Sequence, residues 1–224
     1  MTFCAGLASQ GKLPVFAVYS SFLQRSYDQL IHDCAIENRH IVLGIDRAGF
    51  VGEDGETHHG LFDVAMLSTV PTATLYSPCD TSELSVCLEQ ALYSDTGISA
   101  GRYPRGCELS HSDNDKYCDY KYISGGNKKL VFVYGRIAAY AKDLSDTADI
   151  LQAIKIYPIS DEIIKICLEY DEIYVFEEGE RDGGIAQKLC TALVIAGYKG
   201  KFSITAVTQA LQHNFATQSL ALTV

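Results

Sequence analysis

The sequence predicts an α/β protein in which two domains each contain a parallel sheet with crossover helices. Three observations support this prediction. Short apolar runs rich in β-branched and aromatic residues alternate with segments of helical periodicity along the chain. A polar, Asp-rich stretch at residues 107–127 ends in Gly-Gly-Asn, which is typical of a connection between domains. The length of 224 residues fits one large domain or two modest ones.

Four short apolar runs in the first half of the chain predict strands. They lie at residues 14–19, 41–45, 73–76 and 98–103. Between the first two runs, residues 24–37 predict a helix, because their apolar side chains fall on one stripe at helical spacing. The stripe contains Tyr27, Leu30, Ile31, Cys34 and Ala35. After the third run, Asp80 and Glu83 form a capping pattern that predicts the start of a second helix.

The same alternation resumes after the polar stretch. Strands are predicted at residues 130–134, 150–156, 173–176 and 202–207. Ser160, Asp161 and Glu162 predict a helix start, because a hydroxyl cap and acidic residues stabilise the amino terminus of a helix. A further helix is expected at residues 185–196, where Gly197 ends the periodic pattern.

The composition excludes several classes of function. A net charge of −10 argues against a nucleic-acid partner, because phosphate backbones are bound by an excess of Lys and Arg. No apolar run approaches the roughly 20 residues of a membrane-spanning helix, and the amino terminus lacks the pattern of a secretory signal. The eight Cys residues form neither a Cys-x-x-Cys motif nor a zinc-type spacing with His. We therefore expect reduced, mostly buried thiols in a cytoplasmic protein.

Polar and charged residues follow the predicted strands of the first half. Parallel sheets bind ligands beyond the carboxyl ends of their strands. If these strands are neighbours, we expect Tyr19, Arg47 and Arg105 to converge on one pocket with either His58 or His59.

The two arginines suit a phosphate monoester, because each guanidinium can donate two charge-assisted hydrogen bonds. The alternative is that Arg47 and Arg105 each pair with a nearby acid, such as Asp46 or Glu108.

The two histidines lie in a glycine-flanked acidic loop and suit proton transfer near neutral pH. Neighbours in an extended stretch point to opposite sides, so only one of His58 and His59 is expected to face a given pocket. The alternative is that both are solvent-exposed loop residues. The sequence Asp54-Gly55-Glu56 lacks the spaced oxygen ligands of a calcium loop, and we expect no metal ligand in this chain.

Two further features have alternative interpretations. Tyr19 and Phe22 are either core aromatics or a flat platform for a ring-shaped ligand. The EEG motif at residues 177–179, with the glycine pair at residues 183–184, marks either a second site or an ordinary turn from a strand into a helix.

Five blocks of the sequence together resemble the 1-deoxy-D-xylulose-5-phosphate synthases. They are YSSFLQRSYDQLIHD (residues 19–33), IDRAGFVGEDGETHHGLFD (45–63), SPCDTSEL (77–84), RYPRG (102–106) and EEGERDGG (177–184). Their order and spacing match along nearly the whole chain. The first two blocks distinguish this family from other transketolases, which share the architecture.

The resemblance implies a thiamine-diphosphate-dependent transferase that condenses pyruvate with D-glyceraldehyde 3-phosphate and releases carbon dioxide. The product of the family feeds the synthesis of isoprenoid precursors, thiamine and pyridoxal phosphate. Family members are dimers of three-domain chains, with a Mg²⁺–diphosphate-binding domain, a pyrimidine-binding domain and a transketolase-type carboxyl-terminal domain. By this resemblance, residues 1–112 form the second domain, 113–127 a linker and 128–224 the third domain.

The resemblance also implies roles for individual residues. Phe22 matches the aromatic residue that stacks on the aminopyrimidine ring of the cofactor, and Arg25 matches an arginine that supports the same site. Tyr19, Arg47 and Arg105 match the groups that receive the phosphorylated aldehyde.

Asp54 and His58 match loop residues that face the reacting substrates. This match makes His58 the expected proton carrier and His59 the spare histidine. The glycines of the loop are expected to let it close over the reacting groups and exclude water.

The chain also departs from the family pattern. The Gly-Asp-Gly…Asn motif that carries Mg²⁺ is absent, together with the domain that holds it. The first strand of the pyrimidine-binding domain and its catalytic Glu are expected to lie before Met1, so that the chain starts inside a helix. Residues 213–224 are expected to fall short of a final helix. We therefore expect a fragment that is inactive by itself.

A missing edge strand would leave unpaired backbone groups and favour association, so a homodimer is expected. Two alternatives remain open. In place of a fragment of the synthase, one alternative is a subunit of a split transketolase-like enzyme, whose partner supplies the cofactor half, and the other is a non-catalytic module that has kept the phosphate-binding Arg pair. Pyruvate and D-glyceraldehyde 3-phosphate are the expected small-molecule partners, with no nucleic acid and no membrane.

Overall fold

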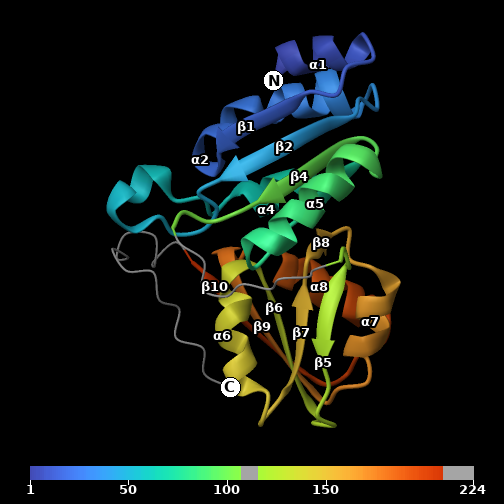
Figure 1. Cartoon of the computed structure of the whole chain (residues 1–224). Coiled ribbons are helices and arrows are strands. Elements are labelled where there is room, and N and C mark those ends of the chain that lie inside the picture. Colours follow the sequence, from blue (N-terminus) through green and yellow to red (C-terminus); the bar gives the residue numbers. More distant parts are fainter. Residues whose placement is uncertain (107–115, 209–224) are drawn as a thin grey trace.

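Two five-stranded sheets, one in the upper and one in the lower part of the molecule as drawn in Figure 1, form the framework of the computed structural model, which describes residues 1–106 and 116–208. The first sheet has the strand order β1-β2-β4-β3-β8, and the second has the order β10-β9-β6-β7-β5. In each sheet four strands run parallel, and the last strand of the order, β8 or β5, is antiparallel. The predicted α/β class is therefore confirmed, with an antiparallel strand added at one edge of each sheet.

The first sheet contains the four strands predicted in the first half of the chain, each within one residue of its predicted ends. They are β1 (Val15–Tyr19), β2 (Ile41–Asp46), β3 (Ala73–Tyr76) and β4 (Ile98–Arg102). β2 lies between two neighbours, and its first five residues are buried, which explains why its sequence is entirely apolar up to Asp46. The helices of this part are α1 (Thr2–Ser9), α2 (Ser20–Leu23), α3 (Tyr27–Gln29), α4 (Asp63–Leu67) and α5 (Thr81–Tyr93).

The helix predicted at residues 24–37 is helical but not continuous. It consists of a 3₁₀ turn (Gln24–Ser26), the short α3 and a π-helical segment (Leu30–Ala35). A π turn spaces its side chains differently from an α-helix. It still buries three members of the predicted stripe, Leu30, Cys34 and Ala35.

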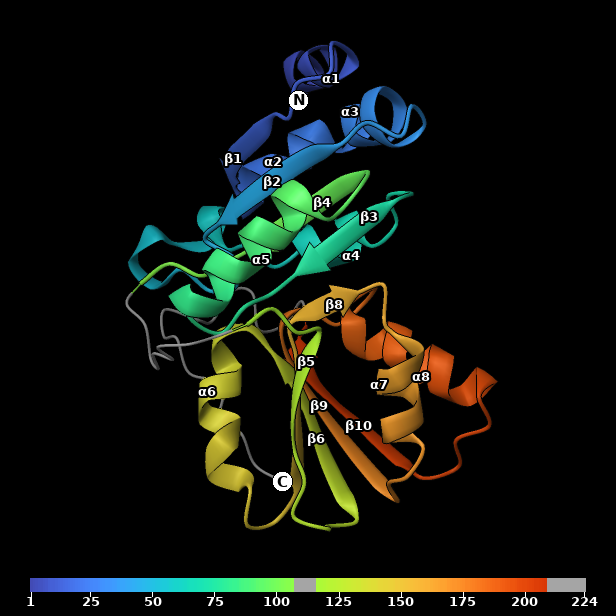
Figure 2. The same ribbon diagram turned by 45° about the vertical axis from the view of Figure 1, so that its right-hand side comes forward.

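The second sheet contains β5 (Tyr120–Ile123), β6 (Lys129–Tyr134), β7 (Asp149–Ala153), β9 (Glu172–Glu180) and β10 (Lys201–Val207). Figure 2 shows α6 (Ala138–Ala141) on one side of this sheet and α7 (Asp161–Cys167) and α8 (Ile185–Ile195) on the other. The caps predicted at the starts of α5 and α7 are present. The Asp80 carboxylate accepts a hydrogen bond from the backbone N–H of Glu83, and the Ser160 hydroxyl accepts one from Ile163.

Two predictions for the second half are wrong in detail. The single strand expected at residues 150–156 is divided, because after Ala153 the chain leaves the second sheet and Lys155–Tyr157 pairs as β8 with β3 of the first sheet. The backbone N–H groups of Ile154 and Lys155 both donate to the carbonyl of Asp119 at this crossing, each at 2.9 Å. The segment expected to be only a connection contains β5, which pairs with β7.

The amino-terminal helical segment expected from the sequence is present as α1. The carboxyl-terminal residues 213–224, where a final helix was expected to be incomplete, lie outside the described residues, and so does Glu108. Among the described residues, no helix is long and apolar enough to cross a membrane.

Candidate functional site

Seven residues singled out from the sequence form one continuous set of contacts beyond the carboxyl ends of β1, β2 and β4. They come from the end of β1 and the helical segment that follows it, from the loop at residues 47–60 and from the segment after β4. The set consists of Tyr19, Phe22, Arg25, Arg47, Asp54, His58 and Arg105. Of the residues expected in one pocket, Arg47 and Arg105 line a common cavity, whereas Tyr19 and His58 join them only through ring contacts and are not part of its lining.

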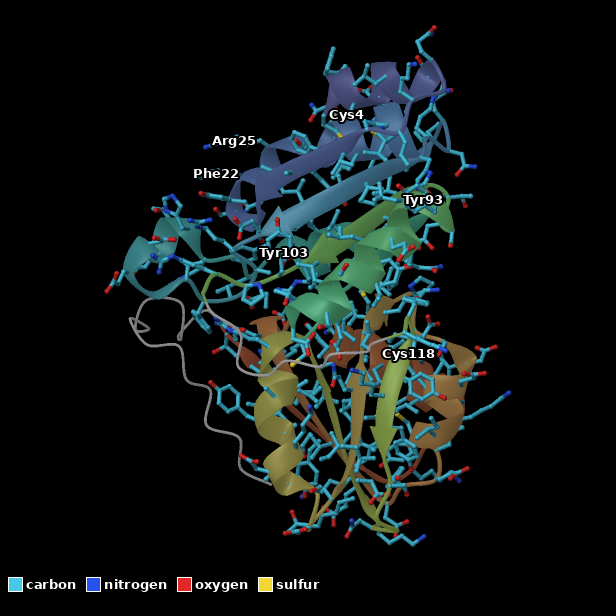
Figure 3. All side chains as sticks on the ribbon, viewed as in Figure 1. Cys4, Phe22, Arg25, Tyr93, Tyr103 and Cys118 are labelled. Atoms are coloured by element: carbon cyan, nitrogen blue, oxygen red, sulfur yellow. The ribbon has the colours of Figure 1, made fainter. Side chains whose placement is uncertain are left out.

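Phe22 is the centre of the aromatic part of the site. Its ring stacks on that of Tyr19, with centroids 5.6 Å apart and planes 22° apart, and the ring of His58 meets it edge-on at 5.4 Å. The Arg25 guanidinium lies 5.6 Å from the Phe22 ring centroid, and the two side chains are neighbours at the rim of the first sheet (Figure 3). With 37% of its surface exposed, Phe22 is not a core aromatic.

Arg47 is held from three directions. Its guanidinium lies 3.9 Å from the centroid of the Tyr19 ring. Its Nη1 donates to Asp46 at 2.8 Å, and its Nε donates to Asp54 at 3.0 Å. The hydrogen bond to Asp54 is the main reason why the pKa of Arg47 is raised above its ordinary value.

Asp54 connects the two arginines. The carboxylate Oδ2 that accepts from Arg47 also lies 3.1 Å from Nε of Arg105. The alternative in which each arginine pairs with a nearby acid is therefore correct for this conformation, although Asp54 was not among the acids expected for that role. A carboxylate between two guanidinium groups occupies a position that suits an anion.

The backbone of the loop is fixed by close packing at Gly60. Gly49 and Gly60 exchange two backbone hydrogen bonds, at 2.7 and 2.8 Å. A Cβ atom at Gly60 would lie 2.2 Å from the Arg47 carbonyl oxygen. Arg47 itself has a φ of 60°, which is unusual for a residue with a side chain, and the Asp46 side chain accepts a hydrogen bond from its N–H at 2.7 Å.

The two histidines have different environments. His58 is partly exposed, and its Nδ1 lies 2.9 Å from the Thr57 hydroxyl. His59 is 6% exposed, packs against Phe50, and accepts a hydrogen bond at Nδ1 from the backbone N–H of Val51. Only His58 contacts the aromatic part of the site.

A cavity of about 390 Å³ adjoins the arginines, which is a volume suited to a small molecule. Its wall combines the ends of β2 and β4 with the start of α5, and Tyr103 lies at this edge of the first sheet (Figure 3). Burial raises the pKa of Tyr103 above its ordinary value. Arg136, from the turn after β6 in the second sheet, also lines the cavity.

Arg136 could not be singled out from the sequence, because it follows a predicted strand without a recognised motif. Its partner Glu178 belongs to the EEG motif, for which a separate second site was one interpretation. The structure instead places Glu178 against the loop of the first site, where it accepts a hydrogen bond from the N–H of Phe50 at 3.0 Å. Among the residues described, no three His, Cys, Asp or Glu side chains form a group that could hold a metal ion.

Comparison with known proteins defines the class. Residues 1–107 match the family described as transketolase, pyrimidine binding domain. A solved structure titled "Split gene transketolase, inactive beta4 tetramer" superimposes with a TM-score of 0.81 over 92% of this chain and 71% of its own. Its sequence identity of 16% supports a shared fold only. The fold is therefore of the transketolase type, and residues 1–107 are similar to transketolase pyrimidine-binding domains.

The curated relatives identify the family more closely, and all those named here are 1-deoxy-D-xylulose-5-phosphate synthases. The Chlorobaculum tepidum protein is 60% identical over 106 residues, which cover 47% of this chain and 17% of the relative. A Thermus thermophilus protein is 34% identical over 98% of this chain and 37% of its own length. A Campylobacter jejuni protein is 36% identical over 83% of this chain and 32% of its own.

The resemblance to the 1-deoxy-D-xylulose-5-phosphate synthases is thus confirmed along nearly the whole chain. The chain spans little more than a third of the length of these relatives at most.

Proposed function

We propose that this chain is the pyrimidine-binding and carboxyl-terminal part of a 1-deoxy-D-xylulose-5-phosphate synthase. In this proposal the complete enzyme condenses pyruvate with D-glyceraldehyde 3-phosphate for isoprenoid-precursor and thiamine synthesis. The observation that carries the proposal is the single network of contacts formed by the seven motif residues. Similarity to the Thermus thermophilus synthase over 98% of the chain supports it. We place the domain boundaries at residues 1–112 and 128–224, with β8 of the later part completing the first sheet.

The residues around Phe22 fit the aminopyrimidine ring of thiamine diphosphate. The exposed ring of Phe22 offers a stacking surface, and Arg25 lies beside it. When bound, this cofactor would supply the nucleophilic carbon that attacks pyruvate. The edge-on contact of His58 with Phe22 supports a role for this imidazole in proton transfer beside the proposed ring site.

Tyr19, Arg47 and Arg105 are proposed to bind the phosphate of D-glyceraldehyde 3-phosphate. Two guanidinium groups that share one carboxylate are already spaced to share an anion. In this role the substrate phosphate either displaces the Asp54 carboxylate from the two arginines or binds them together with it. Asp54 and His58 then face the reacting groups from the same loop.

We propose that Mg²⁺ and the diphosphate of the cofactor are held by residues outside this chain, and that the isolated chain is inactive. The test is a coupled assay of pyruvate and D-glyceraldehyde 3-phosphate with thiamine diphosphate and Mg²⁺. The purified chain is expected to give no product, and product formation by the chain alone would contradict this part of the proposal.

The same assay tests a second candidate function, a subunit of a split transketolase-like enzyme. The structural neighbour is itself described as a split gene transketolase. Adding the amino-terminal part of the Chlorobaculum tepidum synthase would restore turnover if the chain works as a separate half. A third candidate, a non-catalytic phosphate-binding module, predicts binding of D-glyceraldehyde 3-phosphate with no turnover in any mixture.

A homodimer in the cytoplasm completes the proposal. β1 lies at the edge of the first sheet, and its first residue, Val15, is 55% exposed, which supports association through this side. None of the described cysteines is in a disulfide, which is usual in proteins of reducing compartments. Light scattering at micromolar concentration should give twice the mass of 24.5 kDa, and a clean monomer would contradict the dimer.

A further inference from the structure

A third arginine approaches the phosphate site from the second sheet. Arg136 follows β6 in the 3₁₀ turn Gly135–Ile137, and its side chain lines the same cavity as Arg47 and Arg105. This side chain is 12% exposed, so most of it is packed against protein. The orientation of this side chain is therefore set by the protein groups that it contacts.

Two partners hold the Arg136 guanidinium. Its Nε donates to Glu178 Oε2 at 2.7 Å, and its Nη2 donates both to Glu178 Oε1 and, at 3.0 Å, to the carbonyl of Phe50. Because Glu178 also accepts a hydrogen bond from the N–H of Phe50, the Arg136–Glu178 ion pair of the second sheet binds the backbone of the loop that carries Arg47. A fixed guanidinium loses less entropy than a free one when it binds an anion.

Each of the three arginines keeps one nitrogen free within the described part of the chain. Arg47 uses Nε and Nη1, and its Nη2 has no partner there. Arg105 uses Nε and Nη1, which leaves its Nη2. Arg136 uses Nε and Nη2, which leaves its Nη1. Arg47, Arg105 and Arg136 thus line one cavity from three separate segments, and each has a guanidinium nitrogen that makes no hydrogen bond to a described residue.

The lining of the cavity contains three arginines and two aspartates, Asp46 and Asp80. The arginines are paired with Asp46, Asp54 and Glu178, so an anion in the cavity would compete with these carboxylates for them. The amino terminus of α5, which begins at Thr81, borders the same space and adds a positive dipole end.

We propose that Arg136 is a direct ligand of the phosphate group bound by Arg47 and Arg105, so that the second sheet takes part in substrate recognition. This inference rests on the proposed function in one respect, the presence of a phosphate site at Arg47 and Arg105. The competing interpretation gives Arg136 a purely structural role, in which its pair with Glu178 anchors the backbone of Phe50.

The test is a titration of the full chain with inorganic phosphate, followed by ³¹P NMR line broadening. The double variant R136Q/E178Q replaces the ion pair by two neutral amides that can still hydrogen-bond, and it leaves the net charge unchanged. The matched control is R181Q/D182N, which makes the same change in an exposed Arg–Asp pair with N···O at 3.4 Å. The single variant E178Q keeps Arg136 and removes only its counter-charge. Thermal melting of each variant reports whether it is folded.

The proposal predicts about tenfold weaker phosphate binding in R136Q/E178Q, the size expected for a lost hydrogen bond to a charged group. The control should bind like the unmodified chain. E178Q should bind phosphate at least as tightly as the unmodified chain, because Arg136 is then no longer neutralised. R136K, which keeps the charge, should recover part of the affinity lost in an R136Q variant.

Three results would overturn the proposal. If R136Q/E178Q binds phosphate normally while R47Q does not, Arg136 is no ligand, and the proposed function stands. If E178Q weakens binding as much as the double variant does, the pair has only the structural role. If the unmodified chain binds no phosphate, the phosphate site of the proposed function fails as well.

Discussion

The substitution Gly60→Ala tests how tightly the fold sets the position of Arg47. The added Cβ would lie 2.2 Å from the Arg47 carbonyl oxygen and 2.7 Å from both Cβ and Oγ of Ser20. Real Cβ atoms essentially never approach other atoms closer than 3.0 Å, so the backbones at Gly60 and Arg47 must move apart by about 0.8 Å or more. Overpacking of this kind costs roughly 1–3 kcal/mol.

The displacement should affect binding as well as stability. Arg47 contacts Tyr19 and Asp54 at short range, and a shift of its backbone disturbs both contacts. We expect Gly60→Ala to lower the free energy of unfolding by about 2 kcal/mol and to weaken phosphate binding. Urea unfolding followed by circular dichroism and the ³¹P NMR titration measure the two effects.

The control is Gly6→Ala, which makes the same chemical change in α1, where no atom lies within 4 Å of the added Cβ. Alanine favours a helix over glycine, so this variant should be more stable by roughly 0.5–1 kcal/mol. If Gly60→Ala behaves like Gly6→Ala in both assays, the argument from close packing at Gly60 is refuted.

Three further predictions concern acidic residues and not the arginines that line the cavity. Burial raises the pKa of Glu177 to about 7 from an ordinary value of 4.5, so the folded state holds this proton more tightly and stability falls as pH rises between these values. Glu177→Gln should remove that part of the pH dependence and be more stable than the unmodified chain at pH 8 by up to roughly 3 kcal/mol. The free energy of unfolding is measured with urea at several pH values, and the same change with pH in both proteins would contradict this prediction. Asp63→Asn should cost roughly 3–5 kcal/mol, because it leaves the buried Arg102 without its carboxylate partner at 2.9 Å; a loss below about 1 kcal/mol would show that the pair is not strongly coupled. Asp80→Ala removes the cap on the Glu83 N–H and should lower the free energy of unfolding by about 1 kcal/mol, and an unchanged value would mean that another group replaces the cap.

The strands of the first sheet could be predicted because the apolar character of each run fits its place in the sheet. The run at residues 41–45 is wholly apolar, and the structure places it in a parallel strand between two neighbours. The run at residues 150–156 is also mostly apolar, yet it belongs to two sheets. Nothing in its composition marks the crossing after Ala153, which depends on the distant carbonyl of Asp119. β5 was missed because it is half-exposed and lies in a polar segment.

The candidate site was likewise predictable from the sequence only in part. Strand ends and loop motifs were enough to predict that Tyr19, Arg47 and Arg105 meet, because parallel strands share one edge. The contribution of Arg136 could not be predicted in this way, since it depends on how the two sheets pack. The Asp54 bridge was also missed, because a carboxylate seven residues after Arg47 meets Arg105 only once the loop is folded.

The most direct test of the central claim is a calorimetric titration with D-glyceraldehyde 3-phosphate and with unphosphorylated D-glyceraldehyde. The account predicts that the unmodified chain binds the phosphorylated aldehyde and not the unphosphorylated one, and that R47Q/R105Q loses this binding. Equal heats for the two aldehydes, or unchanged binding in R47Q/R105Q, would contradict the assignment of this sheet edge as a phosphate-binding site.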